Sequence, residues 1–355
     1  MGTTTAGGGT GQPDPALLAW CRRVPKVELH LHLEGAIPHP TFLELVRKYD
    51  PAGPVGDLDT LIERFRYRDF PHFLDVWNWK HGFLREADDF AFIAEAVAHD
   101  LAGQRVRYAE MSFSPTDVAA LGLSVGELAV AIRAGLDRVA GIQVGLIVDL
   151  VRDNGPERAT RTLAEAAEVR ELGVVGIGIG GSEHDFPAEP FGPVYRRARA
   201  LGLHTTVHAG EAAGPASVWG ALTLAPDRIG HGTRAAEDRR LVEHLAAHQV
   251  PLEMCPVSNV RTAVVPSLAT HPIGEFFAAG IPVTVNTDDP AMFDTSLALE
   301  YALLMEGLGF TPDGIRTLVL NAVAASWLPQ DRRAALAAEM GAHAAWTAPA
   351  PVSSP

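Results

Sequence analysis

Two histidines, His30 and His32, are separated by a single residue in the segment PKVELHLHLEG, residues 25–35. Polar and apolar residues alternate along this segment, which predicts a β-strand. Residues two apart in a strand point to the same side, so both imidazoles project from one face, where they can bind one metal ion. Glu34 follows on the same face, and Gly35 marks the turn out. Because His-x-His also occurs at strand ends by chance, the interpretation depends on the rest of the chain.

Further titratable residues end three other apolar runs. The three segments are TVHAGE (206–211), IGHG (229–232) and NTDDP (286–290). If these runs are parallel strands of a barrel, their carboxyl ends converge on one mouth. Four histidines, one glutamate and two aspartates would then surround one opening. Burying so many charged groups is costly unless they act together, so the arrangement indicates a functional site.

Short apolar runs alternate with helical patterns such as Glu157–Leu172 and Asp238–His248. The runs are Val27–Leu33, Val106–Phe113, Ile142–Leu150, Val174–Ile179, His204–His208, Arg228–His231, Val250–Cys255 and Ile281–Thr287. Alternating strands and helices favour a parallel sheet. Eight such units suit an α/β fold of the (β/α)8 TIM barrel type, with an open doubly wound sheet as the alternative.

The interval between the first two runs is too long for a simple crossover. It contains the crowded aromatic residues Phe65, Tyr67, Phe70, Phe73, Trp77 and Trp79. Phe73 and Trp77 are four apart and would share a helical face. These residues either pack onto the barrel or form an inserted helical lid after the first strand, which would offer an apolar wall to a flat ligand.

The composition limits the class of protein and its partners. The chain has 355 residues, 47% of them hydrophobic, and a formal net charge of −14. An acidic chain repels phosphate backbones, so we expect no nucleic-acid partner. The two cysteines cannot form a disulfide framework, which fits a cytoplasmic setting. We found no apolar stretch long enough to span a membrane and expect no membrane partner.

We expect one folded domain between two polar ends. The Gly- and Thr-rich residues 1–15 predict a disordered leader, and residues 344–355, which end in PAPVSSP, predict a disordered tail. The intervening residues 16–343 contain no linker or low-complexity break and are expected to form the barrel. The oligomeric state is left open.

The residue types indicate a zinc site. Neutral imidazoles and a carboxylate are good zinc ligands, and we expect one Zn²⁺ per chain. The expected ligands are His30, His32, His208 and Asp288. They leave room for a water molecule, which becomes a nucleophile when a metal lowers its pKa.

Other residues at the same mouth are suited to proton transfer. His231 is a candidate to hold or deprotonate the water, and Glu211 can donate a proton to a substrate nitrogen. Asp289 points away from Asp288, so it can contact substrate while its neighbour binds the metal. We therefore expect Glu211, His231 and Asp288 to be catalytic.

The fourth run ends in the glycine-rich segment GIGIGGSE, residues 176–183. A lone glycine cluster is a weak signal for phosphate, and here it favours close approach of backbone amides to a flat ligand. This strand offers no lysine, which argues against a binuclear site bridged by a carbamylated lysine.

Taken together, these segments resemble the adenosine deaminase family of zinc aminohydrolases. The matching segments are ELHLHLEGAI (28–37), VHAGE (207–211), RIGHG (228–232), LEMCP (252–256) and NTDDP (286–290). They occur in the family's order between Pro25 and Leu328. The smaller cytidine-deaminase type of zinc site needs His-x-Glu and Pro-Cys-x-x-Cys, and neither occurs here.

The resemblance implies a barrel enzyme that hydrolyses the 6-amino group of an adenine ring. Glu211 would protonate ring N1 and make C6 electrophilic, while His231 would orient and deprotonate the attacking water. Asp289 would hydrogen-bond N7, and the Gly181 amide would lie near N3. His32 and Glu34 complete the expected substrate-binding residues. The partner is thus a small-molecule purine.

Some positions depart from the adenosine-specific pattern. Glu34 replaces an aspartate that contacts the ribose 5′-hydroxyl in adenosine enzymes and is similar to members that look adenine-specific. The segment GGSEHDFP (180–187) differs from the usual Gly-Asp-Glu. The segments CPVSNVRT (255–262) and DPAMF (289–293) resemble bacterial members that act on aminodeoxyfutalosine. Adenosine or 2′-deoxyadenosine is the first expectation, with adenine and aminodeoxyfutalosine as alternatives.

Two functions of other classes remain to be compared with deamination. A catalytically silent purine-binding barrel would need none of the proton-transfer residues, all of which are present. An amidohydrolase for amide or phosphoester bonds would not need paired aspartates together with a glutamate placed for a ring nitrogen. Bound zinc and ammonia release distinguish these functions from deamination.

Overall fold

A barrel of parallel strands forms the centre of the molecule. The computed structural model describes residues 13–67 and 70–347, and within them eight strands lie side by side in chain order. The strands are β1 (Lys26–His32), β2 (Val106–Phe113), β3 (Gln143–Asp149), β4 (Val174–Gly178), β5 (His204–Ala209), β6 (Arg228–His231), β7 (Leu252–Met254) and β8 (Val283–Val285). Each predicted run forms a strand, which confirms the (β/α)8 TIM barrel and excludes the open doubly wound sheet.

The first and last strands meet and close the barrel. Leu31 forms a parallel bridge with Asp288, just beyond β8. The Glu28 carboxylate accepts hydrogen bonds from the Thr287 backbone N–H at 3.0 Å and from its hydroxyl at 3.1 Å. Both residues are buried. Backbone and side-chain contacts therefore join the two ends of the sheet at a seam between β1 and β8.

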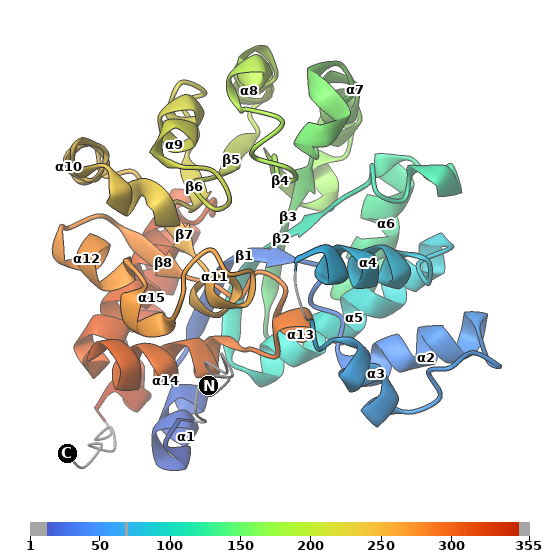
Figure 1. The fold of residues 1–355 in the computed structure, drawn as a ribbon, viewed down its shortest axis with the longest axis horizontal. Helices are drawn as coiled ribbons and strands as arrows, with labels where there is room; N and C mark the ends of the chain where they lie inside the picture. Colours follow the sequence, from blue (N-terminus) through green and yellow to red (C-terminus); the bar gives the residue numbers. More distant parts are fainter. Residues whose placement is uncertain (1–12, 68–69, 348–355) are drawn as a thin grey trace, which may run out of the picture.

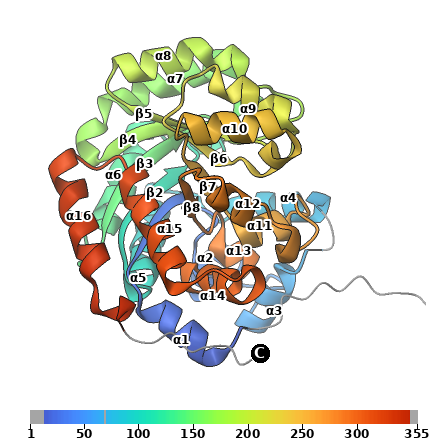
Figure 2. The ribbon, with the colours of Figure 1, turned by 90° about the vertical axis from the view of Figure 1, so that its left-hand side faces the viewer.

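Helices surround the strands on the outside (Figures 1 and 2). Those along the outer layer are α5 (Ala87–Gly103), α6 (Val125–Leu136), α7 (Gly155–Glu168), α8 (Gly192–Ala200), α9 (Pro215–Leu222), α10 (Arg239–Ala247), α12 (Ile273–Ala278), α14 (Leu297–Leu308), α15 (Pro312–Ala325) and α16 (Gln330–Ala342). The strands are buried along almost their whole length, as expected when a parallel sheet is covered by helices. The rigid barrel fixes the loops that follow its strands.

Two short helices, α11 (Pro256–Arg261) and α13 (Pro290–Phe293), follow β7 and β8 directly. Each begins with a proline, whose fixed φ suits the first helical position. They carry residues at the carboxyl ends of the strands, and Figure 1 shows both in front of the strands. These helices therefore belong to the mouth of the barrel rather than to its outer layer.

The insertion after β1 is helical, as expected. It comprises α2 (His39–Tyr49), α3 (Leu58–Arg64) and α4 (Phe70–His81), drawn in blue in Figure 1. Phe65 and Trp79 pack against Phe42, and their ring centroids lie 6.0 and 5.6 Å, respectively, from that of Phe42. Part of the aromatic cluster thus serves packing. The expected pairing of Phe73 with Trp77, like the Phe70 side chain, lies outside the described residues, and the lid stays a prediction.

The predicted ends of the folded domain, after residue 15 and before residue 344, stay predictions. Helix α1 (Pro15–Arg23) begins at the last residue of the expected leader, and residues 1–12 lie outside the described part. Ala344–Trp346 form a 3₁₀ turn, and the Trp346 ring lies 5.8 Å from that of Trp20. Residues 348–355 of the expected tail are not described. Across residues 13–67 and 70–347, no helix combines the length and apolar character needed to cross a membrane.

Candidate active site

The four residues expected to bind metal lie together at the mouth of the barrel. His30 and His32 come from β1, His208 from β5 and Asp288 from the end of β8, and one ligand atom of each lies within 4.8 Å of the others. The Asp288 Oδ1 atom is 3.4 Å from His30 Nε2 and 3.2 Å from His32 Nε2. This donor set and spacing fit a single cation bound by nitrogen and oxygen.

The charges of this cluster favour a positive ion at its centre. Burial opposes protonation of His30, but hydrogen bonds to Asp288 and Glu253 outweigh it and raise the His30 pKa to about 10. The pKa of His32 rises to about 9, again against burial, because of Asp288. Burial alone would raise the Asp288 pKa, yet both histidines hold it well below its usual value. A bound metal cation would supply the positive charge that these surroundings favour.

His208 completes the cluster differently. Burial lowers its pKa well below the usual value, and the neighbouring His30 and His231 add to the effect. Its ring centroid is 4.5 Å from that of His30 and 5.3 Å from that of His32. His208 is therefore neutral at pH 7, which is the form that binds a metal.

Unusual backbone conformations aim two of the site residues. His231 and Asp288 have φ angles of +60° and +63°, in the left-handed region that side chains other than glycine rarely adopt. Both stand where a strand ends, and the left-handed turn there directs the side chain to the mouth. Backbone strain of this kind gathers at functional sites, where the surrounding structure holds it in place.

Glycine leaves room for two other site residues. A Cβ atom at Gly230 would lie 2.8 Å from His30 Cε1, and one at Gly35 would lie 1.6 Å from Asp289 Oδ1. Neither position can carry a side chain while the neighbour keeps its place. The glycine of the ELHLHLEG segment is thus needed for space beside Asp289 as well as for the turn.

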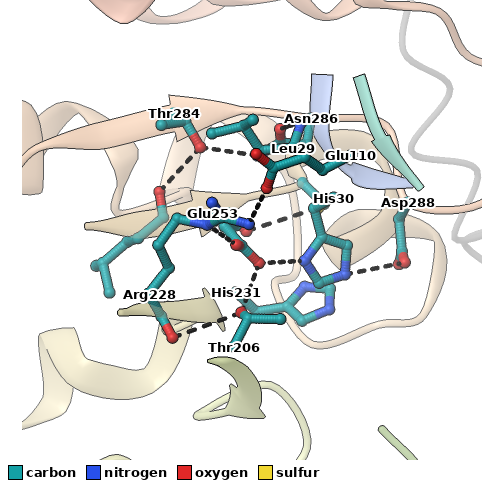
Figure 3. A network of polar contacts seen from close by, with 12 residues as sticks. Leu29, His30, Glu110, Thr206, Arg228, His231, Glu253, Thr284, Asn286 and Asp288 are labelled. Carbon is teal, nitrogen blue, oxygen red and sulfur yellow. Dashed lines mark hydrogen bonds and ion pairs between the residues drawn. The ribbon is translucent and has the colours of Figure 1, made fainter. Parts of the chain in front are cut away.

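Two residues that sequence reasoning had not assigned orient the metal-site residues. The His30 Nδ1–H donates to Glu253 Oε2 at 2.8 Å, which leaves Nε2 directed at Asp288 (Figure 3). The Ser258 hydroxyl donates to Asp288 Oδ2 at 2.7 Å and leaves Oδ1 for the cluster. Partners of this kind fix a ligand's orientation and tune its affinity. Glu253 lies in the LEMCP segment that carried the family resemblance, and Ser258 lies in the CPVSNVRT segment that resembled bacterial members, which was the signal available.

Glu253 is itself held by a buried ionic network on β2, β6 and β7 (Figure 3). Arg228 Nε donates to Glu253 Oε1 at 2.5 Å, and another guanidinium nitrogen donates to Glu110 Oε2 at 2.5 Å. The three side chains are fully buried. Burial would raise the Glu253 pKa, but Arg228 and His30 hold it at about 2, so the carboxylate that orients His30 stays charged.

The candidate proton-transfer residues face each other beside the cluster. Glu211 Oε2 lies 3.6 Å from His231 Nε2. Burial, together with the charges of Asp288 and Glu183, raises the Glu211 pKa to about 8. A raised pKa lets Glu211 keep its proton to a higher pH, and the protonated form is the one that can donate a proton.

Glu183 holds the loop that carries Glu211, and sequence reasoning had not assigned it a role. Its carboxylate accepts four backbone N–H groups, from residues 210–213, at 2.5 to 3.1 Å. Gly210 adopts a φ of +68°, which lets successive amides turn toward one acceptor. The loop after β5 is thereby fixed, and Glu211 with it.

Two of the expected substrate-binding residues, Asp289 and Glu34, are buried at the mouth of the barrel. Asp289 and Glu34 are 7% and 2% exposed, respectively. Burial and the neighbouring Asp288 raise the Asp289 pKa to about 7, and its Oδ1 has no hydrogen-bond partner among the described residues. Glu34 Oε1 accepts the Ser114 N–H at 3.0 Å. Both therefore remain candidates for contact with a ligand.

Gly181 lies further out than expected. It is exposed, and a Cβ atom there would lie 2.0 Å from Asp153 Oδ2. The preceding Gly180 is the residue near the cluster, because a Cβ at that position would lie 3.7 Å from His208 Cε1. The amide expected beside N3 of a ring is therefore at the rim, and its role stays a prediction.

A second grouping, His231, Cys255 and Asp288, shares a residue with the first. Burial raises the Cys255 pKa well above its usual value, and the charge of Asp288 adds to this. A thiol of that kind is a poor metal ligand, because thiolate is the binding form. The His₃Asp cluster is the better cation site.

Comparison with known proteins agrees with this geometry. The family model for adenosine deaminase matches residues 25–343. The chain belongs to the adenosine deaminase family. Members of this family are amidohydrolases, and proteins similar to this chain are named as deaminases. The family assignment made from the sequence is confirmed.

The relatives of this adenosine deaminase family member bear different substrate names. An aminodeoxyfutalosine deaminase of Streptomyces coelicolor is 39% identical over 94% of this chain and 88% of its own. An adenine deaminase of Bordetella parapertussis is 38% identical over 86% of this chain and 97% of its own. An amidohydrolase from Burkholderia ambifaria, solved with bound Zn, has a TM-score of 0.84 and 30% identity, covering 93% of each chain.

Proposed function

We propose that the protein is a zinc-dependent hydrolase that replaces the 6-amino group of an adenine-containing compound with oxygen and releases ammonia. The observation that carries this proposal is the His₃Asp cluster with Glu211 beside it, 3.6 Å from His231, in surroundings that raise the pKa of its carboxyl group. Zinc is favoured by three imidazoles and one carboxylate at one point, and when bound it would lower the pKa of a water molecule. His30, His32, His208 and Asp288 would hold the ion.

The remaining residues would act on the purine. Glu211 would give its proton to ring N1, which draws electrons from C6 and prepares it for attack. Asp289, with a pKa near 7 and a free Oδ1, can donate a hydrogen bond from its protonated form to N7, which only accepts. His231 would lie beside the attacking oxygen, opposite Glu211. Together these contacts would select a 6-aminopurine over other amines.

The N9 substituent distinguishes three candidate substrates. The sequence favours adenosine or 2′-deoxyadenosine, whereas two similar proteins are named as aminodeoxyfutalosine and adenine deaminases. Glu34 supports a contact beyond the ring, because it is buried near Lys80 of α4 and keeps one carboxylate oxygen outside its bond to Ser114. The proposal covers all three candidates, because the same reaction, deamination at C6 of the adenine ring, is proposed for each of them.

Ammonia release from a substrate panel tests the reaction. The panel contains adenosine, 2′-deoxyadenosine, adenine, aminodeoxyfutalosine and N6-methyl analogues. We expect one of the unmethylated compounds to be turned over and the purified chain to contain one zinc ion. If the zinc-loaded chain releases neither ammonia from the unmethylated compounds nor methylamine from the N6-methyl analogues, the purine-binding barrel is supported instead.

Removal of one ligand tests the metal assignment. His208→Ala should lose zinc and activity together, because three remaining ligands leave an incomplete site. His204→Ala is the matched control, since it lies on the same strand with a half-exposed side chain outside the cluster. Full zinc occupancy in the His208 variant would show that this residue is not a ligand.

Glu34→Ala tests what is recognised beyond the ring. If a nucleoside is the substrate and Glu34 binds its hydroxyl, adenosine should exceed 5′-deoxyadenosine by about 10³-fold, and the variant should lose most of that difference. If Glu34 instead occupies the space of a ribose, adenine should be the best substrate and adenosine nearly inert. Equal rates on all three compounds would leave Glu34 a structural residue.

A further inference from the structure

Three buried side chains beyond the metal cluster form a hydrogen-bonded row. His231 ends β6, Asn259 lies on α11, and His271 precedes α12. Asn259 Nδ2 lies 3.1 Å from His231 Nδ1, and Asn259 Oδ1 lies 3.1 Å from His271 Nε2. Their exposed fractions are 1%, 0% and 4%. Asn259 and His271 have no part in the proposed chemistry above, yet they reach it through His231.

The direction of this row is fixed at its far end. The Ile273 backbone N–H donates to His271 Nδ1 at 3.2 Å. A backbone amide can only donate, so His271 Nδ1 accepts and the neutral ring carries its proton on Nε2. Burial lowers the His271 pKa to about 3, which keeps the ring neutral. His271 Nε2 must then donate to Asn259.

The orientation of the Asn259 amide follows from the donors that its oxygen meets. Its oxygen accepts from His271 Nε2 and also from the Thr233 hydroxyl, at 3.1 Å. With two donors on the oxygen side, the amide NH₂ faces His231. An amide NH₂ cannot accept, so His231 Nδ1 must accept.

The proton of neutral His231 therefore lies on Nε2, the nitrogen that faces the active site. That atom is 3.6 Å from Glu211 Oε2 and makes no hydrogen bond within the described part of the chain. A buried N–H without a partner is costly and is available to a ligand.

We propose that Asn259 and His271 are positioning residues that hold His231 as the Nε2–H tautomer, so that His231 donates a hydrogen bond to the attacking oxygen. In this tautomer Nε2 has no lone pair with which to take a proton from water. The O–H bond that water loses must then be replaced by an O–H bond on a carboxylate of the cluster. This replaces the sequence-based expectation that His231 deprotonates the water. The catalytic consequence rests on the proposed function, whereas the tautomer does not.

The tautomer can be read directly from ¹⁵N NMR of the zinc-loaded chain with labelled histidine, using His231→Gln to assign the signals. We expect a protonated, pyrrole-like Nε2 and an unprotonated, pyridine-like Nδ1. Asn259→Asp replaces the donor by a carboxylate, which only accepts, so the proton of His231 should move to Nδ1. A wild-type His231 that carries its proton on Nδ1 overturns the proposal whatever the activity.

The same variant tests the catalytic consequence. A wrong histidine tautomer lowers kcat by about 10⁴-fold in a serine protease, and we expect Asn259→Asp to lower it by about 10²-fold or more with little change in KM. Asn321→Asp makes the same chemical change in a half-buried amide that donates to the Val283 carbonyl at the start of β8. It should keep near wild-type kcat. Equal losses in the two variants would overturn a positioning role.

A second variant covers the case in which Asn259→Asp does not fold. His271→Phe with Thr233→Val leaves Asn259 in place but removes both donors to its oxygen, so the amide can rotate. We expect a second set of His231 signals with the proton on Nδ1. An unchanged single tautomer would overturn the proposal that this hydrogen-bonded row sets the tautomer of His231. If the wild-type chain shows the expected tautomer but releases no ammonia from any purine, the proposed function fails while the role of the row stands.

Discussion

The barrel contains two groups of buried charges that are treated in opposite ways. In the interior, Arg228 is bonded to both Glu253 and Glu110, and each carboxylate has further donors. At the mouth, several buried polar atoms have no hydrogen-bond partner among the described residues. They include His208 Nδ1, His231 Nε2, Asp289 Oδ1 and Lys80 Nζ.

This difference separates structural from functional charge. A buried ion is stable only when it is paired and hydrogen-bonded, and the interior network meets that condition. The mouth does not, so its groups are available to a metal and a substrate. Glu253 joins the two groups, because it is bonded to Arg228 on one side and to His30 on the other.

The largest effect on stability should come from the interior. Arg228→Met leaves two buried carboxylates without their shared cation and should lower the free energy of unfolding by about 3–5 kcal/mol. Urea unfolding at pH 7 measures it. Arg239→Met is the surface control, since the Arg239 side chain is 92% exposed in its ion pair with Glu243 and should change stability by less than about 1 kcal/mol. Similar losses in both would refute the distinction.

Glu211→Gln changes the mouth and should affect catalysis but not folding. The amide cannot donate a proton to N1, so turnover should fall by about 10²-fold or more while zinc and substrate still bind. Because the Glu211 pKa is raised to about 8, its proton is lost as the pH rises through that region. Wild-type activity should therefore fall on the alkaline side. Turnover within a few-fold of wild type in the variant would exclude the role.

Glu253→Gln tests the residue that joins the two groups. The amide can still accept from His30, but it lacks the charge that strengthens this imidazole as a ligand. We expect zinc affinity to fall by about 10- to 100-fold, the usual effect of such an orienting partner. Competition with a chelator measures it, and Glu253→Asp, which keeps the charge, is the comparison. Unchanged affinity in the glutamine variant would limit Glu253 to the interior network.

Lys80→Met should stabilise the protein slightly, which is the smallest effect. Lys80 is 1% exposed, and burial lowers its pKa to about 8 against the attraction of Asp289 and Glu34. Below pH 8 the amine is charged in both folded and unfolded chains, so its burial penalty is complete. Between pH 8 and about 10.4, where free lysine titrates, the unfolded chain binds more protons, and wild-type stability rises with pH.

The gain from Lys80→Met should therefore be about 1–2 kcal/mol at pH 7 and should disappear as the pH approaches 10.4. Urea unfolding at pH 7 and pH 10 measures both values. Lys48→Met is the control, because the Lys48 side chain is 44% exposed and ion-paired. A loss of stability at pH 7 would place Lys80 with the paired charges of the interior.

The positions of the strands could be predicted because each is a short apolar run, and four of these runs carry titratable residues at or near their ends. That signal lies within a few residues, and it also located His30, His208, His231 and Asp288. The first and last residues of the strands were predicted less well, because β7 and β8 are each three residues long and so are shorter than the predicted runs. Bends at the ends of short strands depend on neighbours that local sequence does not reveal.

The supporting residues could not be predicted for the same physical reason. Glu253 stands inside a strand, where its partners Arg228 and His30 are 25 and 223 residues away. Glu183 bonds amides 27 to 30 residues later in the chain. Spacing in sequence carries no information on such contacts. They become visible only when the barrel brings the strands together.

The seam between β1 and β8 makes the candidate metal centre a clasp between the two ends of the fold. Asp288 comes from one side of that seam and His30 and His32 from the other, and the Leu29 N–H bonds Asn286 across 257 residues of chain. A growing polypeptide therefore cannot assemble the site until almost the entire barrel has been synthesised. Joining such distant segments carries a large loop-closure entropy. Zinc capture would then report completed closure, and a truncated chain would be denied both the metal and the stability that binding adds.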